Sequence, residues 1–334
     1  MSGAIIHGGG IAAAAALYGG TPEDWLDLST GLNPCPPALP VIPARVWHRL
    51  PDRHLFDATR QAAREFYRSG EILPLPVPGT QSVIQLLPRL SKADRPVSIL
   101  SPTYGEYGRV LAASGRPVRA VAELEAVDPA SGLVIVVNPN NPTGRSHRPD
   151  DLLALADRLA GEGGLLVVDE AFGDCTPETS LAGHVGARPN LIVFRSFGKF
   201  FGFAGLRLGF VIAVPEILER FADWLGPWAV SGPALSVAAD LFADDPAGLR
   251  ATIAARRAAL GHVLEASGLV VRGGPSLFAL VEDEQADALH AHLCRAHILT
   301  RKFDYAPTWL RFGLSPDEAS DRRLADALTA WRRP

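Results

Sequence analysis

A series of short, continuous apolar segments between residues 97 and 214 constrains the fold most strongly. Their residues follow one another without polar alternation, which is typical of strands buried on both faces of a sheet. The six segments are Val97–Leu100, Pro117–Val121, Leu133–Val137, Leu165–Val168, Leu191–Phe194 and Leu208–Val214. Helical segments such as Asp150–Ala160 separate several of them. The pattern predicts an α/β fold in which a mostly parallel sheet lies between helices.

The sequence changes character on both sides of this region. Residues 28–44 are proline-rich, and proline disfavours helix at the residue before it, so we expect an extended arm there. A helix over Leu55–Tyr67 follows. After about residue 245 the segments alternate again between helix and strand: Thr252–Ser267, Leu269–Arg272, Leu277–Glu282, Gln285–Ala296, Ile298–Phe303, Trp309–Leu314 and a last helix. We expect an N-terminal arm (residues 1–44), a large domain (45–244) and a smaller α+β domain (245–334).

Composition and charge exclude several classes of function. The chain of 334 residues is 47% hydrophobic and has a net charge of −4, which is a globular composition without the basic excess that nucleic-acid binding needs. The cysteines (Cys35, Cys175 and Cys294) lack metal-ligand spacing and predict neither a zinc site nor a disulfide framework. The first 22 residues lack charge and are interrupted by glycines, so they predict neither a signal peptide nor a membrane span. We expect a cytoplasmic protein that binds no metal, nucleic acid or membrane.

Three polar segments follow the predicted strands, where functional residues of an α/β fold gather. Ser196 to Arg207 reads SFGKFFGFAGLR, and its Lys199 lies between aromatic residues and glycines. Desolvation makes an amine more nucleophilic, which suits Schiff-base chemistry. Asn141 lies in the rigid turn NPNNPTG, and Asp169 ends a buried strand. Taken singly, these residues also suit a solvent-facing lysine, a turn that caps the next helix and a structural ion pair.

Together the three residues match the needs of a pyridine-ring cofactor that acts as an electron sink. Such a cofactor requires a Schiff-base lysine (Lys199), an acid for the ring nitrogen (Asp169) and a donor to the phenolic oxygen (Asn141). It also needs an anion site for its phosphate. Ser196 and Arg207 flank the lysine, and Thr80 and Gln81 lie where a turn opens into a helix with free N–H groups, so these residues can supply that site.

The chain resembles the fold type I pyridoxal 5′-phosphate enzymes of the aminotransferase class I/II group over nearly its whole length. The resemblance implies that Lys199 binds the cofactor covalently, Asp169 binds its ring nitrogen and Asn141 its O3′ oxygen. It further implies that the phosphate is held by Thr80, Gln81, Ser196 and Arg207, and that Tyr104 stacks on the ring. A homodimer is expected, because active sites of this fold lie at the subunit interface. Two positions depart from the family pattern: Phe172 and Leu50 stand where tyrosines are common.

The N-terminal segment, with His7-Gly8-Gly9 and later Leu32-Asn33-Pro34, resembles one subfamily, the L-threonine-O-3-phosphate decarboxylases of cobalamin biosynthesis. This resemblance implies that a phosphorylated amino acid is bound by His7, Gly8, Asn33, Arg301 and Arg311. It implies decarboxylation to (R)-1-amino-2-propanol O-phosphate. Two alternatives stay open: an aminotransferase acting on histidinol phosphate or another phosphorylated amino acid, and a non-catalytic cofactor-binding scaffold or sensor.

Overall fold

The computed structural model describes residues 8–90 and 94–331, and contacts within the chain group it into two compact units. Unit 1 comprises Met1–Pro36, Pro142–Arg145 and Ala247–Pro334, and unit 2 comprises Pro37–Asn141 and Ser146–Pro246. The division into an arm, a large and a small domain stays a prediction. None of the helices in the described ranges combines the length and apolar character that crossing a bilayer requires.

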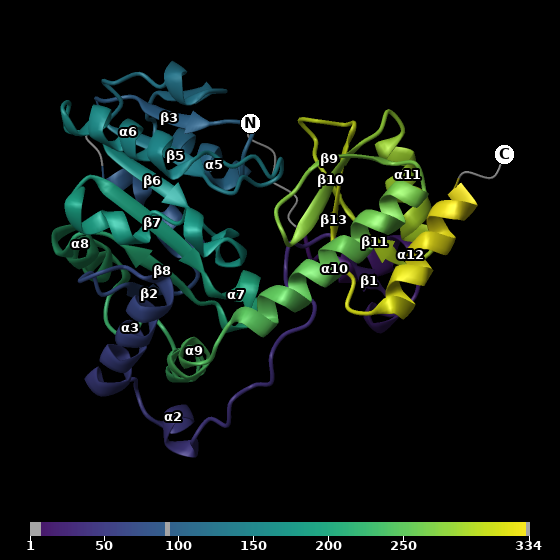
Figure 1. The fold of residues 1–334 in the computed structure, drawn as a ribbon, viewed down its shortest axis with the longest axis horizontal. Coiled ribbons are helices and arrows are strands. Elements are labelled where there is room, and N and C mark those ends of the chain that lie inside the picture. Colours follow the sequence, from purple (N-terminus) through teal and green to yellow (C-terminus); the bar gives the residue numbers. More distant parts are fainter. Residues whose placement is uncertain (1–7, 91–93, 332–334) are drawn as a thin grey trace. The chain divides into compact units, whose positions relative to one another are not determined.

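Unit 2 is built on a seven-stranded sheet (Figure 1). In spatial order its strands are β2 (Leu75–Val77), β8 (Gly209–Ile212), β7 (Leu191–Ser196), β6 (Leu165–Asp169), β5 (Leu133–Val137), β3 (Val97–Leu100) and β4 (Val118–Val121). Neighbouring strands from β7 to β4 are parallel, whereas β8 runs antiparallel to β2 and β7. The prediction of a mostly parallel sheet is confirmed. Burial on both faces is wrong for β4, because β4 is an edge strand whose middle residues are exposed.

Several of the helices in unit 2 pack against this sheet. The helices of this unit are α2 (Ala44–His48), α3 (Arg53–Tyr67), α4 (Thr80–Ile84), α5 (Gly105–Ala113), α6 (Pro149–Ala160), α7 (Phe197–Phe200), α8 (Pro215–Leu225) and α9 (Gly232–Ala243). The side chain of Asp52 caps α3 by accepting a hydrogen bond from the Leu55 amide at 2.9 Å. An aromatic cluster of Phe66, Phe201 and Phe242 anchors the segment that follows β7, with ring centroids 4.6–5.8 Å apart.

Unit 1 contains two small sheets. The parallel pair is β1 (Leu26–Asp27) with β11 (Ile298–Leu299), and the antiparallel sheet has the order β12 (Arg301–Lys302), β13 (Trp309–Gly313), β10 (Phe278–Glu282) and β9 (Val270–Gly273). Its helices are α1 (Ile11–Tyr18), α10 (Ala247–Ala266), α11 (Ala286–Arg295) and α12 (Glu318–Trp331). The predicted strand over Ile298–Phe303 is therefore two strands in different sheets. They are separated at Thr300, whose hydroxyl meets His290 Nδ1 at 2.8 Å.

Candidate active site

One edge of the unit 2 sheet brings together residues predicted to bind a phosphate. Gly209, the first residue of β8, lies opposite both Val77 at the end of β2 and Ser196 at the end of β7. Because β8 is antiparallel to both neighbours, two strand ends and one strand start meet at this edge. A Cβ atom on Gly209 would lie 3.0 Å from the backbone nitrogen of Thr80. Thr80 and Ser196 are thus held around one glycine.

Arg207 reaches the same edge from two residues before β8. Gly79 has φ 71°, a backbone conformation that favours glycine, and a Cβ atom on it would lie 2.9 Å from Arg207 Nη2, so a larger residue would displace the guanidinium. Arg207 Nη1 donates to the Ala204 carbonyl at 3.2 Å. Within the described part of the chain, Arg207 forms no ion pair, and the hydroxyls of Thr80 and Ser196 form no hydrogen bond. A guanidinium and two hydroxyls are therefore available to an anion.

Asp169 is a buried carboxylate at the end of β6. It is 4% exposed and accepts hydrogen bonds from the Tyr107 hydroxyl at 2.7 Å and the Ala171 amide at 3.0 Å. Burial raises the pKa of Asp169 above its ordinary value, although the Tyr107 and Ala171 hydrogen bonds and the charge of Lys199 act to lower it. A buried carboxylate of this kind is stabilised by a cationic donor, so the position suits a protonated ring nitrogen.

Lys199 is half-buried on α7, three residues beyond Ser196. Its Nζ lies 5.7 Å from the centroid of the Phe172 ring, over which the ammonium makes a cation–π contact. Phe172 is itself buried and follows Asp169 by three residues. The phenylalanine that departs from the family pattern therefore lines the surroundings of the lysine and offers no hydroxyl.

Tyr104 is connected to Asp169 through Tyr107, a residue that the sequence analysis missed. Its hydroxyl donates to Gln81 Oε1 at 3.2 Å, and its ring lies edge-on to that of Tyr107, with centroids 6.2 Å apart. Tyr107 in turn donates to Asp169. Gln81 also donates from Nε2 to the buried Glu106 at 2.7 Å. Tyr104 is the residue before α5 and Tyr107 lies in its first turn, so their spacing in the sequence carried no signal that Tyr107 reaches Asp169.

Asn141 lies at the end of the turn after β5. The turn is anchored at both sides: the Asn138 amide donates to the Asp169 carbonyl at 2.9 Å, and the Thr103 hydroxyl donates to Asn140 Oδ1 at 2.6 Å. Asn141 is half-buried. The turn that carries Asn141 is therefore held by hydrogen bonds to Asp169 and to Thr103, the residue before Tyr104.

A buried ion-pair network lies beside the site and was also missed. Arg195 contacts Glu170 at 2.5 Å and also pairs with Asp174, and each side chain is 2% exposed. Burial lowers the pKa of Arg195, but the two carboxylates raise it more, so it stays above its ordinary value. Because Glu170 follows Asp169 and Arg195 precedes Ser196, the network fixes the backbone at two strand ends of the site.

The predicted substrate arginines are neighbours within unit 1. Arg301 on β12 lies directly opposite Arg311 on β13. Arg311 is 7% exposed, its Nη2 donates to the Ser29 carbonyl at 2.7 Å, and its guanidinium stacks over the Phe278 ring at 4.9 Å. Arg301 stacks over Phe303 at 5.5 Å. Two facing guanidinium groups create a local positive potential that suits an anionic ligand.

Two further predicted substrate residues are described: Gly8 lies beside Ser29, and Asn33 follows it by four residues in the sequence. A Cβ atom on Gly8 would lie 2.5 Å from the Ser29 carbonyl oxygen, so Gly8 and Arg311 approach the same atom. The buried Asn33 bonds the backbone nitrogen and oxygen of Cys35 through its side-chain amide, which shapes a local turn. His7 lies outside the described residues.

Comparisons with known proteins identify relatives over most of the chain. A sequence model described as "Aminotransferase class I and II" matches residues 24–328. A threonine-phosphate decarboxylase from Sinorhizobium sp is 63% identical over 98% of both chains, and one from Pseudomonas aeruginosa is 44% identical over 98% of both. The fold resembles the crystal structure of histidinol-phosphate aminotransferase from Sinorhizobium meliloti in complex with pyridoxal-5′-phosphate. The TM-score is 0.80 at 21% identity, covering 98% of this chain and 96% of that one.

Proposed function

The chain belongs to the aminotransferase class I and II family, and from this premise we propose that it is a pyridoxal 5′-phosphate-dependent decarboxylase. Its substrate would be L-threonine O-3-phosphate and its product (R)-1-amino-2-propanol O-phosphate, a precursor in cobalamin biosynthesis. The observation that carries this proposal is the full-length similarity to two relatives named threonine-phosphate decarboxylase. The arrangement of polar groups in unit 2 supports the cofactor.

The residues of unit 2 fit the cofactor group by group. Pyridoxal phosphate supplies, when bound, an electron-withdrawing ring that accepts the electron pair left at a substrate carbon. Lys199 would hold it covalently, and the buried carboxylate of Asp169 would keep a proton on the ring nitrogen. Thr80, Ser196 and Arg207 would bind the phosphate, with Gly79 leaving the space that the guanidinium needs. Gln81 would help to bind the phosphate, Tyr104 would stack on the ring, and Asn141 would bind the O3′ oxygen.

Substrate selection would depend on the arginines of unit 1. A substrate with a phosphate and a carboxylate presents two anions, and Arg301 and Arg311 offer two guanidinium groups on facing strands. The backbone around Gly8 and Ser29 would support Arg311. We propose His7 and Asn33 as further substrate contacts.

The side chains that anchor the substrate also decide which bond at Cα breaks. The bond that would break is the one that the anchored substrate presents perpendicular to the plane of the cofactor ring. Anchors that place the carboxylate perpendicular lead to loss of carbon dioxide, whereas anchors that place the Cα–H bond there lead to transamination. Arg301 and Arg311 therefore control reaction type as well as affinity in this proposal.

The proposal is tested by product analysis. Purified protein supplied with pyridoxal phosphate is incubated with L-threonine O-3-phosphate and no keto acid, and the products are identified by mass spectrometry. We expect an amine lighter by one carbon dioxide, formed over many turnovers, and no product with the Lys199→Ala variant. Unchanged substrate, together with turnover of histidinol phosphate and 2-oxoglutarate, would instead establish an aminotransferase. Retained turnover by the Lys199→Ala variant would reject both mechanisms.

We further propose that the protein forms a homodimer in the cytoplasm, the compartment in which its free thiols stay reduced. Unit 2 exposes five large apolar side chains: Leu39, Val41, Trp47, Leu50 and Trp228. Unit 2 also contains an apolar cavity of about 470 Å³, and Trp228, Phe56 and Leu75 are among the residues that line it. Exposed large apolar side chains are typical of an interface with a second copy. Sedimentation analysis should give twice 35.6 kDa, and the Trp228→Lys variant should sediment as a monomer.

A further inference from the structure

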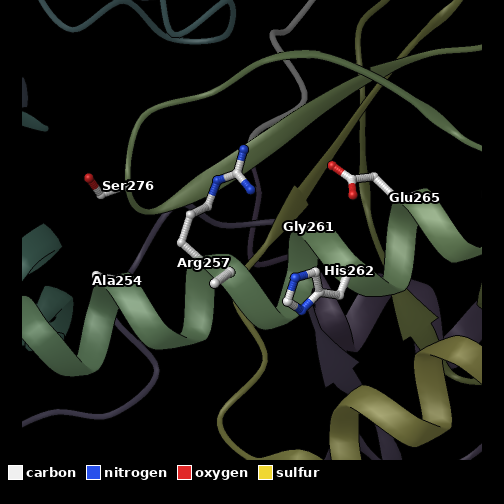
Figure 2. Close-up of a pocket in the computed structure, with 7 residues that line it drawn as sticks. Ala254, Arg257, Gly261, His262, Glu265 and Ser276 are labelled. Carbon is white, nitrogen blue, oxygen red and sulfur yellow. The ribbon is translucent and has the colours of Figure 1, made fainter.

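Unit 1 contains a cavity of about 430 Å³ along α10, whose lining residues have no part in the site described above. Figure 2 shows the lining of this cavity, with the side chains of Arg257 and Glu265 rising from the helix toward the segment that carries Ser276. The remaining lining along the helix consists of His262 and three small residues, Ala254, Ala258 and Gly261. The cavity therefore has an apolar floor and charged groups at its sides.

Arg257 lies on the inner side of α10. The helix buries Ile253, Leu260 and Leu264 along one stripe, and Arg257 follows Ile253 by four residues and precedes Leu260 by three. The guanidinium is half-buried, and among the residues that the structure describes it forms no hydrogen bond or ion pair. Burial lowers the pKa of Arg257, and the charge of Glu265 raises it by less. A half-buried cation without a carboxylate in contact favours an anionic ligand.

Glu265 lies two helical turns after Arg257, with Gly261 midway between them on the same face. The two charges do not form an ion pair in the described structure. A Cβ atom at Gly261 would meet its nearest neighbour, Arg257 Nη1, at 3.5 Å, which is ordinary contact. Packing therefore does not require glycine, although glycine is unfavourable inside a helix relative to alanine. What the glycine provides is open space between the arginine and the glutamate.

We propose that this cavity binds a small zwitterion, a molecule with an anionic phosphate or carboxylate group and an ammonium group a few bonds apart. Arg257 binds the anionic group, and Ser276 lines the same cavity. Glu265 binds the ammonium group. Gly261 leaves room for the carbon chain that joins the two. The half-buried guanidinium of Arg257 then gains an anionic partner, and the exposed carboxylate of Glu265 gains a cationic one.

Binding is measured by titration calorimetry of the purified full-length chain with O-phosphoethanolamine. We expect the Arg257→Gln and Glu265→Gln variants each to weaken one binding event at least tenfold, and the Gly261→Leu variant to remove it by filling the space. The Arg295→Gln variant, which changes an exposed arginine of α11, is the matched control and should bind as the wild type does. Hydrogen exchange should slow in residues 254–265 when O-phosphoethanolamine is added.

Other small molecules test which charged groups of the ligand are needed for binding. β-Alanine tests a carboxylate as the anion, while inorganic phosphate and ethanolamine test each charge alone and should bind at least tenfold more weakly than O-phosphoethanolamine. Equal binding of inorganic phosphate, or isotherms that are the same in the wild type and the Gly261→Leu variant, would overturn the proposal. An event that persists in all three variants belongs to the proposed catalytic site, so the two proposals fail independently.

Discussion

Arg301 and Arg311 stand directly opposite each other on antiparallel strands, so two guanidinium groups share one face of the four-stranded sheet. Like charges in such a pair repel each other and destabilise the sheet unless an anion binds between or beside them. Each guanidinium stacks over a phenylalanine, Arg301 over Phe303 and Arg311 over Phe278, which offsets part of this cost. The pair therefore offers two cationic groups to an anionic ligand, which is the role that the proposed function gives it.

Replacing Arg301 with glutamine should separate binding from stability. Lost repulsion and lost stacking on Phe303 oppose each other, so the free energy of unfolding should change by no more than about 0.5 kcal/mol. The KM for the phosphorylated substrate should rise at least ~10-fold, because a charge-assisted contact is lost. Denaturant unfolding and steady-state kinetics measure the two effects. The neighbouring Lys302→Gln variant serves as control, and a large loss of stability at unchanged KM would contradict the binding role.

Replacing Asp169 with asparagine should stabilise the cofactor-free protein and weaken the effect of the cofactor. The pKa of Asp169 is raised by burial, so its favourable contribution is present below its unfolded pKa and is lost as pH rises through the folded value. At neutral pH the buried charge is therefore a cost, and its removal should add roughly 1–3 kcal/mol to stability.

The measurement for Asp169 is the melting temperature with and without pyridoxal phosphate. The wild type should gain much more from the cofactor than the Asp169→Asn variant does, because only the carboxylate pairs with a protonated ring nitrogen. The exposed Asp151→Asn variant is the control. An equal gain in both proteins would show that Asp169 does not contact the cofactor.

Replacing Gly79 with alanine should disturb the proposed phosphate site without touching a charged group. Alanine at φ 71° costs roughly 1–2 kcal/mol, and its Cβ would press on Arg207 Nη2 from 2.9 Å. We expect the affinity for pyridoxal phosphate to fall at least ~10-fold, a loss of about 1.4 kcal/mol, as measured by titration followed by absorbance. Gly205→Ala is the matched control, since a Cβ there meets nothing within 4 Å. Identical affinity in both variants would contradict the role given to Arg207.

The sequence predicted the buried strands well and the short edge strands poorly. The β-branched segment Leu133–Val137 coincides with β5, because burial on both faces leaves a continuous apolar run. Strand β2 was missed, since it has only three residues and contains Pro76, which is tolerated at a sheet edge. The antiparallel direction of β8 was not predicted either, because an apolar run carries no information on strand direction.

Some residues of the candidate site could be predicted from the sequence, and others could not. Lys199 and Asp169 could be predicted as cofactor residues, because the proposed chemistry requires a lysine and a carboxylate near strand ends. Tyr107 could not, since nothing in a single tyrosine on a helix shows that its hydroxyl reaches a carboxylate 62 residues later in the chain. The pairing of Arg301 with Arg311 was equally hidden, because it depends on the register of two strands.

His290 should make the stability of the protein depend on acid pH. Burial, together with the charge of Lys302, lowers the pKa of His290 from 6.5 to about 4, and the ring contacts Thr300. Because the folded value lies below the unfolded one, this contribution is fully present above pH 6.5 and is lost as pH falls toward 4. After allowance for the partly exposed ring, the loss should be on the order of 2 kcal/mol. Urea unfolding at pH 7 and pH 4.5 measures this loss of stability.

The His290→Gln variant should lose roughly 1 kcal/mol of stability at pH 7, because its hydrogen bond is removed. Its free energy of unfolding should nevertheless drop less on acidification than that of the wild type. The exposed His184→Gln variant should keep the full drop, and an equal drop in all three proteins would mean that other groups set the acid limit.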